Sequence, residues 1–177
     1  LRTIIDRSPD RRFVLLGSAG PSLFRNISES LAGRCASIEL SPFSAAELPD
    51  IPLEERWTYG GYPRLYNLSA DHRFEWLDAY VQSFINRDIP ALGLSLSTQR
   101  LQRLLTMLAH CHGGLLNVNQ LATSLGCSTT AVYDALDVLE QTFLIRRLQP
   151  FHANVRKRLV KSPKVYIRDT GVLHRLL

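Results

Sequence analysis

The chain has 177 residues, of which 45% are hydrophobic, and its formal net charge is +5. This length and composition are ordinary for a globular protein with one substantial core or two small domains, and they argue against a disordered chain. The apolar runs are far shorter than the roughly 20 residues that a membrane-spanning helix needs, and the first residues lack the pattern of a signal peptide. We therefore expect a cytoplasmic protein without a membrane partner.

The cysteines do not indicate a disulfide framework or a zinc ribbon. Cys35, Cys111 and Cys127 are odd in number and form no CxxC pair. The adjacent residues His110, Cys111 and His112 cannot converge on one ion from a helix, because consecutive helical side chains point about 100° apart. We therefore expect reduced, buried thiols and no metal site.

The first part of the chain has the pattern of an α/β fold. LRTIID is helical in pattern, residues 13–16 and 35–40 are candidate strands, and a short helix is expected around Ser22 to Leu31. Two strands and their helices cannot build a sheet that is covered on both faces. We therefore expect the other strands of this sheet to lie outside the chain.

The stretch FVLLGSAGPSLFRNISESLAGR, from Phe13 onward, runs from strand to glycine-containing turn to helix, as a phosphate site does. A Walker A loop needs Gly-Lys-Ser/Thr at its end, and the chain contains no Gly-Lys pair. Gly17 and Gly20 also lack the third glycine of a dinucleotide-binding turn. The turn is therefore not a nucleotide site by itself.

From Ala45 the pattern becomes helical, with a bend at WTYGGYP, where Gly60, Gly61 and Pro63 disfavour regular structure. Between Asp71 and about Arg87, apolar residues recur at spacings of three and four, which predicts an amphipathic helix that Pro90 and Gly93 end. These apolar residues are Phe74, Leu77, Val81, Phe84 and Ile85.

The last part predicts a winged helix-turn-helix. Helices are expected over Thr98–His110 and Asn117–Leu125, and Ser128 should cap a third helix after the turn at Gly126-Cys127. FLIRRLQPF and KVYIRD have the composition of the two strands of a wing. The expected core side chains are Leu101, Leu104, Leu105, Leu108, Leu121, Val132, Leu136 and Leu139.

The basic residues lie after the third predicted helix and not on it. The exposed candidates on that helix are Thr129, Thr130, Tyr133, Asp134 and Asp137, and they include no cation for phosphates or bases. No acidic residue lies between Gln141 and Arg168. This basic segment could contact nucleic acid, lie in solvent or dock an acidic partner. Its candidate nucleic-acid-binding residues are Arg146, Arg147, Arg156, Lys157, Arg158, Lys161 and Lys164.

Six collinear motifs resemble one family. They are FVLLGSAGPSLFRNISESLAGR, SIELSPFSAAEL, WTYGGYP, YVQSFINRDI, the segment LLNVNQLATSLGCS, and KRLVKSPKVYIRDTG. Together they are similar to the bacterial and archaeal AAA-type P-loop ATPases that carry a C-terminal domain of unknown function. In that family the Walker A and Walker B residues precede the position of Leu1. The resemblance therefore implies ATP and Mg²⁺ as cofactors of a full-length protein, and neither is expected for this chain alone.

The resemblance also suggests individual site residues. Ser18 matches a sensor that helps to orient the attacking water, although it could equally cap a turn. Arg34 and Arg87 match arginines that could reach a neighbour's γ-phosphate, or pair with carboxylates such as Glu29 or Asp88. Members of the family continue past the RDTG strand into a region that resembles restriction-type nucleases.

We therefore expect an α/β fragment, the C-terminal edge of an AAA-type ATPase core, followed by a mostly α region with a winged helix-turn-helix. The expected parts are the ATPase core over 1–44, a helical lid-like segment over 45–96, and the winged-helix domain with the start of the domain of unknown function over 97–177. The expected function is a nucleotide-driven switch that acts on an unknown partner, in a full-length ATPase of which this chain alone is inactive. The alternatives are a DNA-binding winged helix and a module for protein interaction or homo-oligomerisation.

Overall fold

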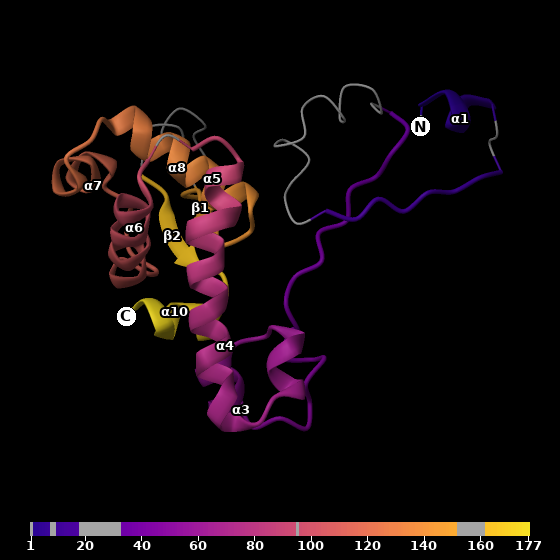
Figure 1. Cartoon of the computed structure of the whole chain (residues 1–177), viewed down its shortest axis with the longest axis horizontal. Coiled ribbons are helices and arrows are strands. Elements are labelled where there is room, and N and C mark those ends of the chain that lie inside the picture. The colour runs from indigo at the N-terminus through magenta and orange to yellow at the C-terminus, as the bar shows by residue number, and fades with distance from the viewer. Residues whose placement is uncertain (1, 8–9, 18–32, 95, 152–161) are drawn as a thin grey trace. The chain divides into compact units, whose positions relative to one another are not determined.

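The computed structural model describes residues 2–7, 10–17, 33–94, 96–151 and 162–177. The chain divides into two compact units, Leu1–Leu40 and Ser41–Leu177. The described residues are mostly helical, with one small antiparallel sheet of two strands (Figure 1). Within these ranges, no helix is both long enough and apolar enough to cross a lipid bilayer.

In the first unit, helix α1 covers Arg2–Arg7, as the LRTIID pattern predicts. The strand predictions for residues 13–16 and 35–40 are wrong, because both segments lack regular structure and Leu16 and Leu40 are almost fully exposed. A strand is held by hydrogen bonds to a neighbouring strand, and the described part of the chain offers these segments no such neighbour. The helix predicted around Ser22 to Leu31 lies outside the described residues.

The second unit begins with short helices around one long helix. The amphipathic helix is confirmed as α4, and Leu77 and Ile85 are fully buried while Phe74 is half-buried against the core. Pro90 does not end it. A π-helical turn follows α4 and leads into α5, and Pro90 lies in the first turn of α5. The elements are α3 (Leu53–Tyr59), a 3₁₀ helix (Pro63–Asn67), α4 (Ala70–Ser83), the π-helical turn (Phe84–Asp88) and α5 (Ile89–Ala91).

In the rest of the second unit, the described residues form three helices, two strands and a final helix. The predicted Ser128 cap is confirmed, because its hydroxyl accepts from the Ala131 N–H at 3.1 Å. The Asn117 side chain caps α7 in the same way by accepting from the Gln120 N–H, a role that the sequence did not predict. Between them, Gly126 takes a left-handed conformation with φ of 61°. The elements are α6 (Thr98–His110), α7 (Val118–Leu125), α8 (Thr129–Gln141), β1 (Ile145–Leu148), β2 (Lys164–Ile167) and α10 (Thr170–Leu176).

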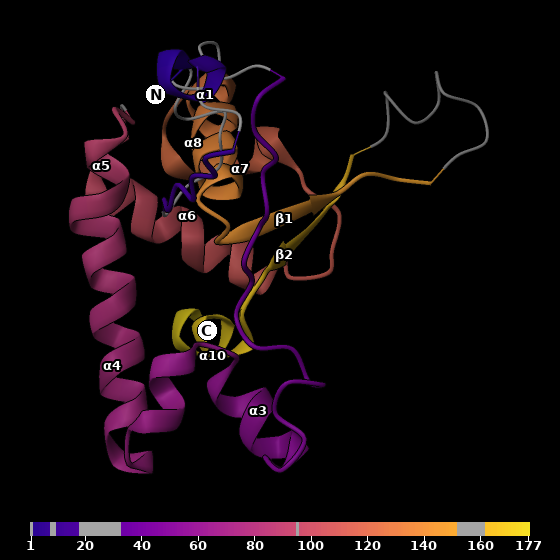
Figure 2. The same ribbon diagram turned by 90° about the vertical axis from the view of Figure 1, so that its right-hand side faces the viewer.

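One hydrophobic core joins these elements. All the leucines and the valine expected to face inward from the three helices are buried. The expectation of buried thiols is wrong, because Cys35 and Cys111 are exposed and Cys127 is only partly buried. Strands β1 and β2 pair with Ile145 opposite Ile167 and Leu148 opposite Lys164, and Leu115 pairs with Lys164 from the other side of β2. The last helix, α10, packs against α3, α4 and α6 (Figure 2). The end of β2 and the start of α10 therefore lie where the elements α3 to α5 meet the elements α6 to β2.

Candidate functional site

Asp169 is the buried charged residue at the centre of this meeting point. It is separated from the end of β2 by Arg168, caps the N-terminus of α10, and is 6% exposed. Its Oδ1 accepts from the Val172 N–H at 3.0 Å, and its Oδ2 accepts from the Gly61 N–H at 2.8 Å. One carboxylate thus starts α10 and also holds the bend that follows α3, although Gly61 and Asp169 are 108 residues apart.

Two glycines allow this close approach. Gly60 has φ of 80°, and a Cβ atom at this position would overlap the Asp169 carboxylate. A Cβ atom at Gly61 would overlap the backbone oxygen of Phe43. The glycines of WTYGGYP are therefore needed for contact with two different segments, and not only for the bend itself.

The environment of Asp169 has opposing effects on its pKa. Burial raises the pKa because it disfavours the charged form, and the N–H groups of Gly61, Val172 and Gly171 act against burial by donating to the carboxylate. The net direction is upward from the ordinary aspartate value. The carboxylate is thus held in place by backbone donors at a cost in desolvation.

The segment that precedes α3 is bound to the same bend. We call residues 41–48 the connector. The Phe43 N–H donates to the Gly61 backbone oxygen at 2.7 Å, and the Arg56 Nη1 donates to the Ala45 backbone oxygen at 2.7 Å. The Phe43 ring also lies 6.3 Å from the Tyr66 ring, centroid to centroid. Gly61 is therefore bound on one side by the connector and on the other by Asp169.

A groove of about 310 Å³ lies between the connector and this junction. Phe43 and Leu48 of the connector line one side, and Trp57, Arg56 and Asp169 line the other. The Nε atom of Arg56 is buried and has no hydrogen-bond partner among the residues that the structure describes. Because the Asp169 oxygens are bonded to backbone N–H groups of two segments, the carboxylate joins these segments.

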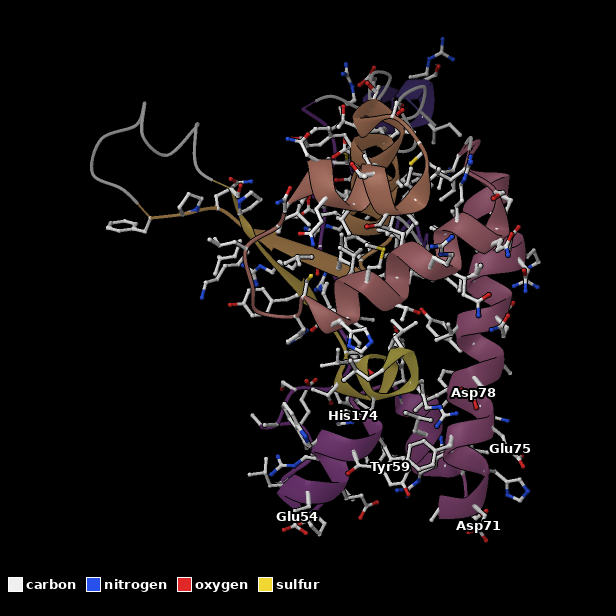
Figure 3. All side chains as sticks on the ribbon, turned by 90° about the vertical axis from the view of Figure 1, so that its left-hand side faces the viewer. Glu54, Tyr59, Asp71, Glu75, Asp78 and His174 are labelled. Carbon is white, nitrogen blue, oxygen red and sulfur yellow. The ribbon has the colours of Figure 1, made fainter. Side chains whose placement is uncertain are left out.

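Contacts from α10 strengthen the junction. The Thr170 hydroxyl donates to the Arg56 backbone oxygen at 3.3 Å, and the His174 Nδ1 lies 3.2 Å from the Thr58 backbone oxygen. Figure 3 shows His174 and Tyr59 in the region where α10, α3 and α4 meet, with Glu54, Asp71 and Glu75 outside it. On the flank, Arg175 forms a bidentate ion pair with Asp78.

The arginines that sequence reasoning singled out are both paired with carboxylates. The Arg34 Nε lies 2.6 Å from Asp6 Oδ1, and the Arg87 Nε lies 2.9 Å from Asp88 Oδ1. Asp88 is the partner considered from the sequence, whereas Asp6 is not. The proposed sensor, Ser18, lies outside the described residues. The roles of these three residues in catalysis stay predictions.

The basic residues of the hairpin β1–β2 are not equivalent. Arg147 is mostly buried and binds two carboxylates of α8, with its Nη2 2.6 Å from Asp137 Oδ1 and its Nε 2.7 Å from Glu140 Oε2. Arg146 and Lys164 are exposed. The remaining candidates for contact with nucleic acid, Arg156, Lys157, Arg158 and Lys161, lie outside the described residues.

Sequence reasoning missed Asp169 as a site residue. The signal was present, because RDTG and WTYGGYP are both among the collinear motifs, and each brings glycine next to polar or aromatic residues. Neither pattern says which residues meet in space. Only the fold shows that Asp169 of RDTG binds the Gly61 N–H of WTYGGYP.

Comparisons with known proteins match two parts of the chain separately. A family model described as Domain of unknown function (DUF8612) matches residues 51–177, and a model described as AAA domain matches residues 1–49. Uncharacterized proteins of Mycobacterium bovis and Mycobacterium tuberculosis are each 41% identical to the chain over 179 residues, which cover 100% of this chain and 41% of each relative.

The chain thus spans about two fifths of the length of these curated relatives. No solved structure matches it. The expected resemblance is confirmed at this level: an AAA match at the N-terminus, followed by a domain of unknown function. Because the longer match covers most of its residues, the chain belongs to the family described as Domain of unknown function (DUF8612).

Proposed function

We propose that this chain is the coupling region of a nucleotide-driven switch. In this proposal, residues 1–49 belong to an AAA domain that is completed by residues outside the chain, and residues 51–177 form the domain that responds to the nucleotide. The observation that carries the proposal is the double attachment of Gly61, which binds Phe43 of the connector at 2.7 Å and Asp169 at 2.8 Å. The connector lies at the end of the AAA match.

The hydrogen bonds at Gly61 give the switch a short mechanical path. A displacement of the connector would act on the Gly61 oxygen through the Phe43 N–H, and the Gly61 N–H would transmit it to Asp169. Asp169 is joined to β2 through Arg168 on one side and caps α10 on the other. A change in the AAA domain can therefore reach the hairpin and the final helix through two hydrogen bonds and one buried side chain.

ATP and Mg²⁺ would be bound by residues outside this chain, because the chain has no Gly-Lys pair with which to form a Walker A loop. In the complete protein, Ser18 would act as a sensor, and Arg34 or Arg87 would act as an arginine finger. Arg34 and Arg87 would first have to exchange their carboxylate partners for a phosphate, which a guanidinium can do without changing its charge.

A second candidate function is nucleic-acid binding by the responding domain. Helices α6, α7 and α8 with the hairpin β1–β2 have the element order of a winged helix, and the exposed cations of the hairpin are Arg146 and Lys164. The specific observation in favour is the absence of any Asp or Glu from the sequence between Gln141 and Arg168. A protein partner or a second copy of the chain is the alternative use of this domain.

Hydrogen exchange in a protein that carries this chain with a complete AAA domain tests the coupling. The amides of Phe43 and Gly61 are compared in ADP and in a non-hydrolysable ATP analogue. We expect their exchange rates to differ by about tenfold or more, equivalent to about 1.4 kcal/mol in opening free energy. Buried amides of α6, such as that of Leu105, should not change. Equal exchange of Phe43 and Gly61 in both nucleotide states would contradict the proposal.

A further inference from the structure

The hairpin β1–β2 has two faces of different chemistry. Because side chains alternate along a strand, Ile145 and Arg147 share one face and Arg146 and Leu148 share the other. The register places Tyr166 opposite Arg146 and Lys164 opposite Leu148, so these residues lie on that same second face. Leu115, which pairs with Lys164, extends it. We call this the outer face: Leu115, Arg146, Leu148, Lys164 and Tyr166.

The other face, which carries Ile145 and Arg147, is the inner face, and among the described residues it has no unpaired cation that could bind a ligand. Its guanidinium, that of Arg147, is bound to Asp137 and Glu140 of α8 and its side chain is only 18% exposed. Asp134 and Asp137 remain exposed on α8. A phosphate backbone laid along α8 would meet these carboxylates, so α8 is a poor element for insertion into a DNA groove.

The outer face combines cations with exposed flat or apolar side chains. Arg146 and Lys164 are exposed, Leu115 is 68% exposed and Leu148 is 47% exposed. The Tyr166 ring is half-buried and meets the His112 ring edge-on at 5.3 Å between centroids, which fixes its position. None of the five residues is acidic, and the sequence between the two strands adds Arg156, Lys157, Arg158 and Lys161.

We propose that the outer face binds single-stranded nucleic acid. Arg146 and Lys164 contact phosphates, and unpaired bases stack on Tyr166 and pack against Leu115 and Leu148. Single strands fit this chemistry because their bases are open on both faces, whereas a duplex presents phosphates and groove edges to a flat surface and gives the leucines nothing apolar to cover. The inference rests on the second candidate function above, and it names the class of nucleic acid and the surface.

Fluorescence anisotropy with a labelled oligo(dT) of about 20 nucleotides, and with a duplex of equal length, tests the proposal at about 50 and 200 mM salt. We expect the single strand to bind more tightly than the duplex and to lose affinity steeply with salt. Tyr166→Leu keeps an apolar side chain but removes the ring, and it should weaken binding about 5- to 150-fold without changing the salt dependence.

Matched variants locate the surface. Tyr166→Phe keeps the ring and should bind like the wild type. A urea titration of Tyr166→Leu separates loss of stacking from loss of folding. Tyr133→Leu on α8 and Arg64→Glu on the 3₁₀ helix make similar chemical changes elsewhere and should leave affinity unchanged. Arg146→Glu should abolish binding at about 200 mM salt, because it places a negative charge beside the phosphates.

Each of the other outcomes overturns the inference in a recognisable way. Tighter binding to the duplex that still depends on Arg146 would keep the nucleic-acid function and remove the single-strand assignment. If Tyr133→Leu weakens oligonucleotide binding more than Tyr166→Leu does, the binding surface lies on α8 and not on the outer face. Displacement of the oligonucleotide by polyglutamate at equal charge concentration would make the surface a general site for acidic partners. If neither probe binds at about 25 mM salt, both the nucleic-acid function and the single-strand assignment are wrong, and the proposed nucleotide switch is not affected.

Discussion

Replacing Asp169 with asparagine tests the central junction with almost no change in size. Both carboxylate oxygens accept backbone N–H groups, Oδ1 from Val172 and Oδ2 from Gly61. In Asp169→Asn one oxygen becomes an NH₂ group that faces one of these donors, so a hydrogen bond is lost and buried donors are left unsatisfied. Such a defect costs about 1–3 kcal/mol. Relief of the desolvation that raises the pKa of Asp169 offsets part of this cost.

We therefore expect Asp169→Asn to lower the free energy of unfolding by about 1–3 kcal/mol in urea titrations at neutral pH. Tryptophan fluorescence is a suitable signal, because Trp57 and Trp76 both lie in the second unit and Trp57 lines the groove beside Asp169. Asp78→Asn is the control, since the Asp78 ion pair with Arg175 is exposed and should contribute less than about 1 kcal/mol. If Asp169→Asn costs no more than Asp78→Asn, the junction does not hold the two segments together as described.

Three further predictions concern the core, the pH response and the chemistry. Leu136→Ala should cost about 2–5 kcal/mol in the same titration, because Leu136 is fully buried, and a cost below about half a kilocalorie would show that the packing is wrong. Burial lowers the pKa of His112, whose Nδ1 accepts from the Ile167 N–H, so the unfolded chain takes up a proton more readily and stability should fall as the pH drops below about 6.5. His112→Gln should flatten this slope in unfolding titrations at several pH values, and an unchanged slope would exclude His112 as its source. The purified chain should not turn over Mg-ATP in a phosphate-release assay, because it has no Walker A loop, and turnover that co-purifies with the chain would contradict this.

The helices of the second unit could be predicted closely because their signals are local. Thr98–His110 coincides with α6, and Ser128 caps α8 as expected, since both depend on apolar spacing and a capping side chain a few residues away. The strands expected at 13–16 and 35–40 depend on partners that no local pattern supplies. Their composition is that of a strand, but the ladder that makes a strand lies beyond the segment itself.

The contact between Gly61 and Asp169 and the two faces of the hairpin also depend on residues that are distant in the sequence, so local patterns do not predict them. A pairing across 108 residues, as between Gly61 and Asp169, leaves no trace in hydrophobic periodicity. Arg146 and Arg147 are neighbours of equal charge, and the sequence ranked them alike. Only the register of β1 against β2 and the carboxylates of α8 show that Arg147 is bound within the fold while Arg146 is exposed.

A double-mutant cycle between Phe43 and Asp169 tests most directly whether the connector and the end of β2 are coupled through Gly61. Phe43→Pro removes the backbone N–H that donates to Gly61, and Phe43→Ala keeps it. The free energies of unfolding of these two variants are compared with and without Asp169→Asn, which closes the cycle. Residues that act through one shared hydrogen-bonded group should show an interaction energy of about 0.5–3 kcal/mol. Additive effects, within about 0.3 kcal/mol, would show that the connector and Asp169 bind Gly61 independently, and the proposed path from the AAA domain to the hairpin would then be wrong.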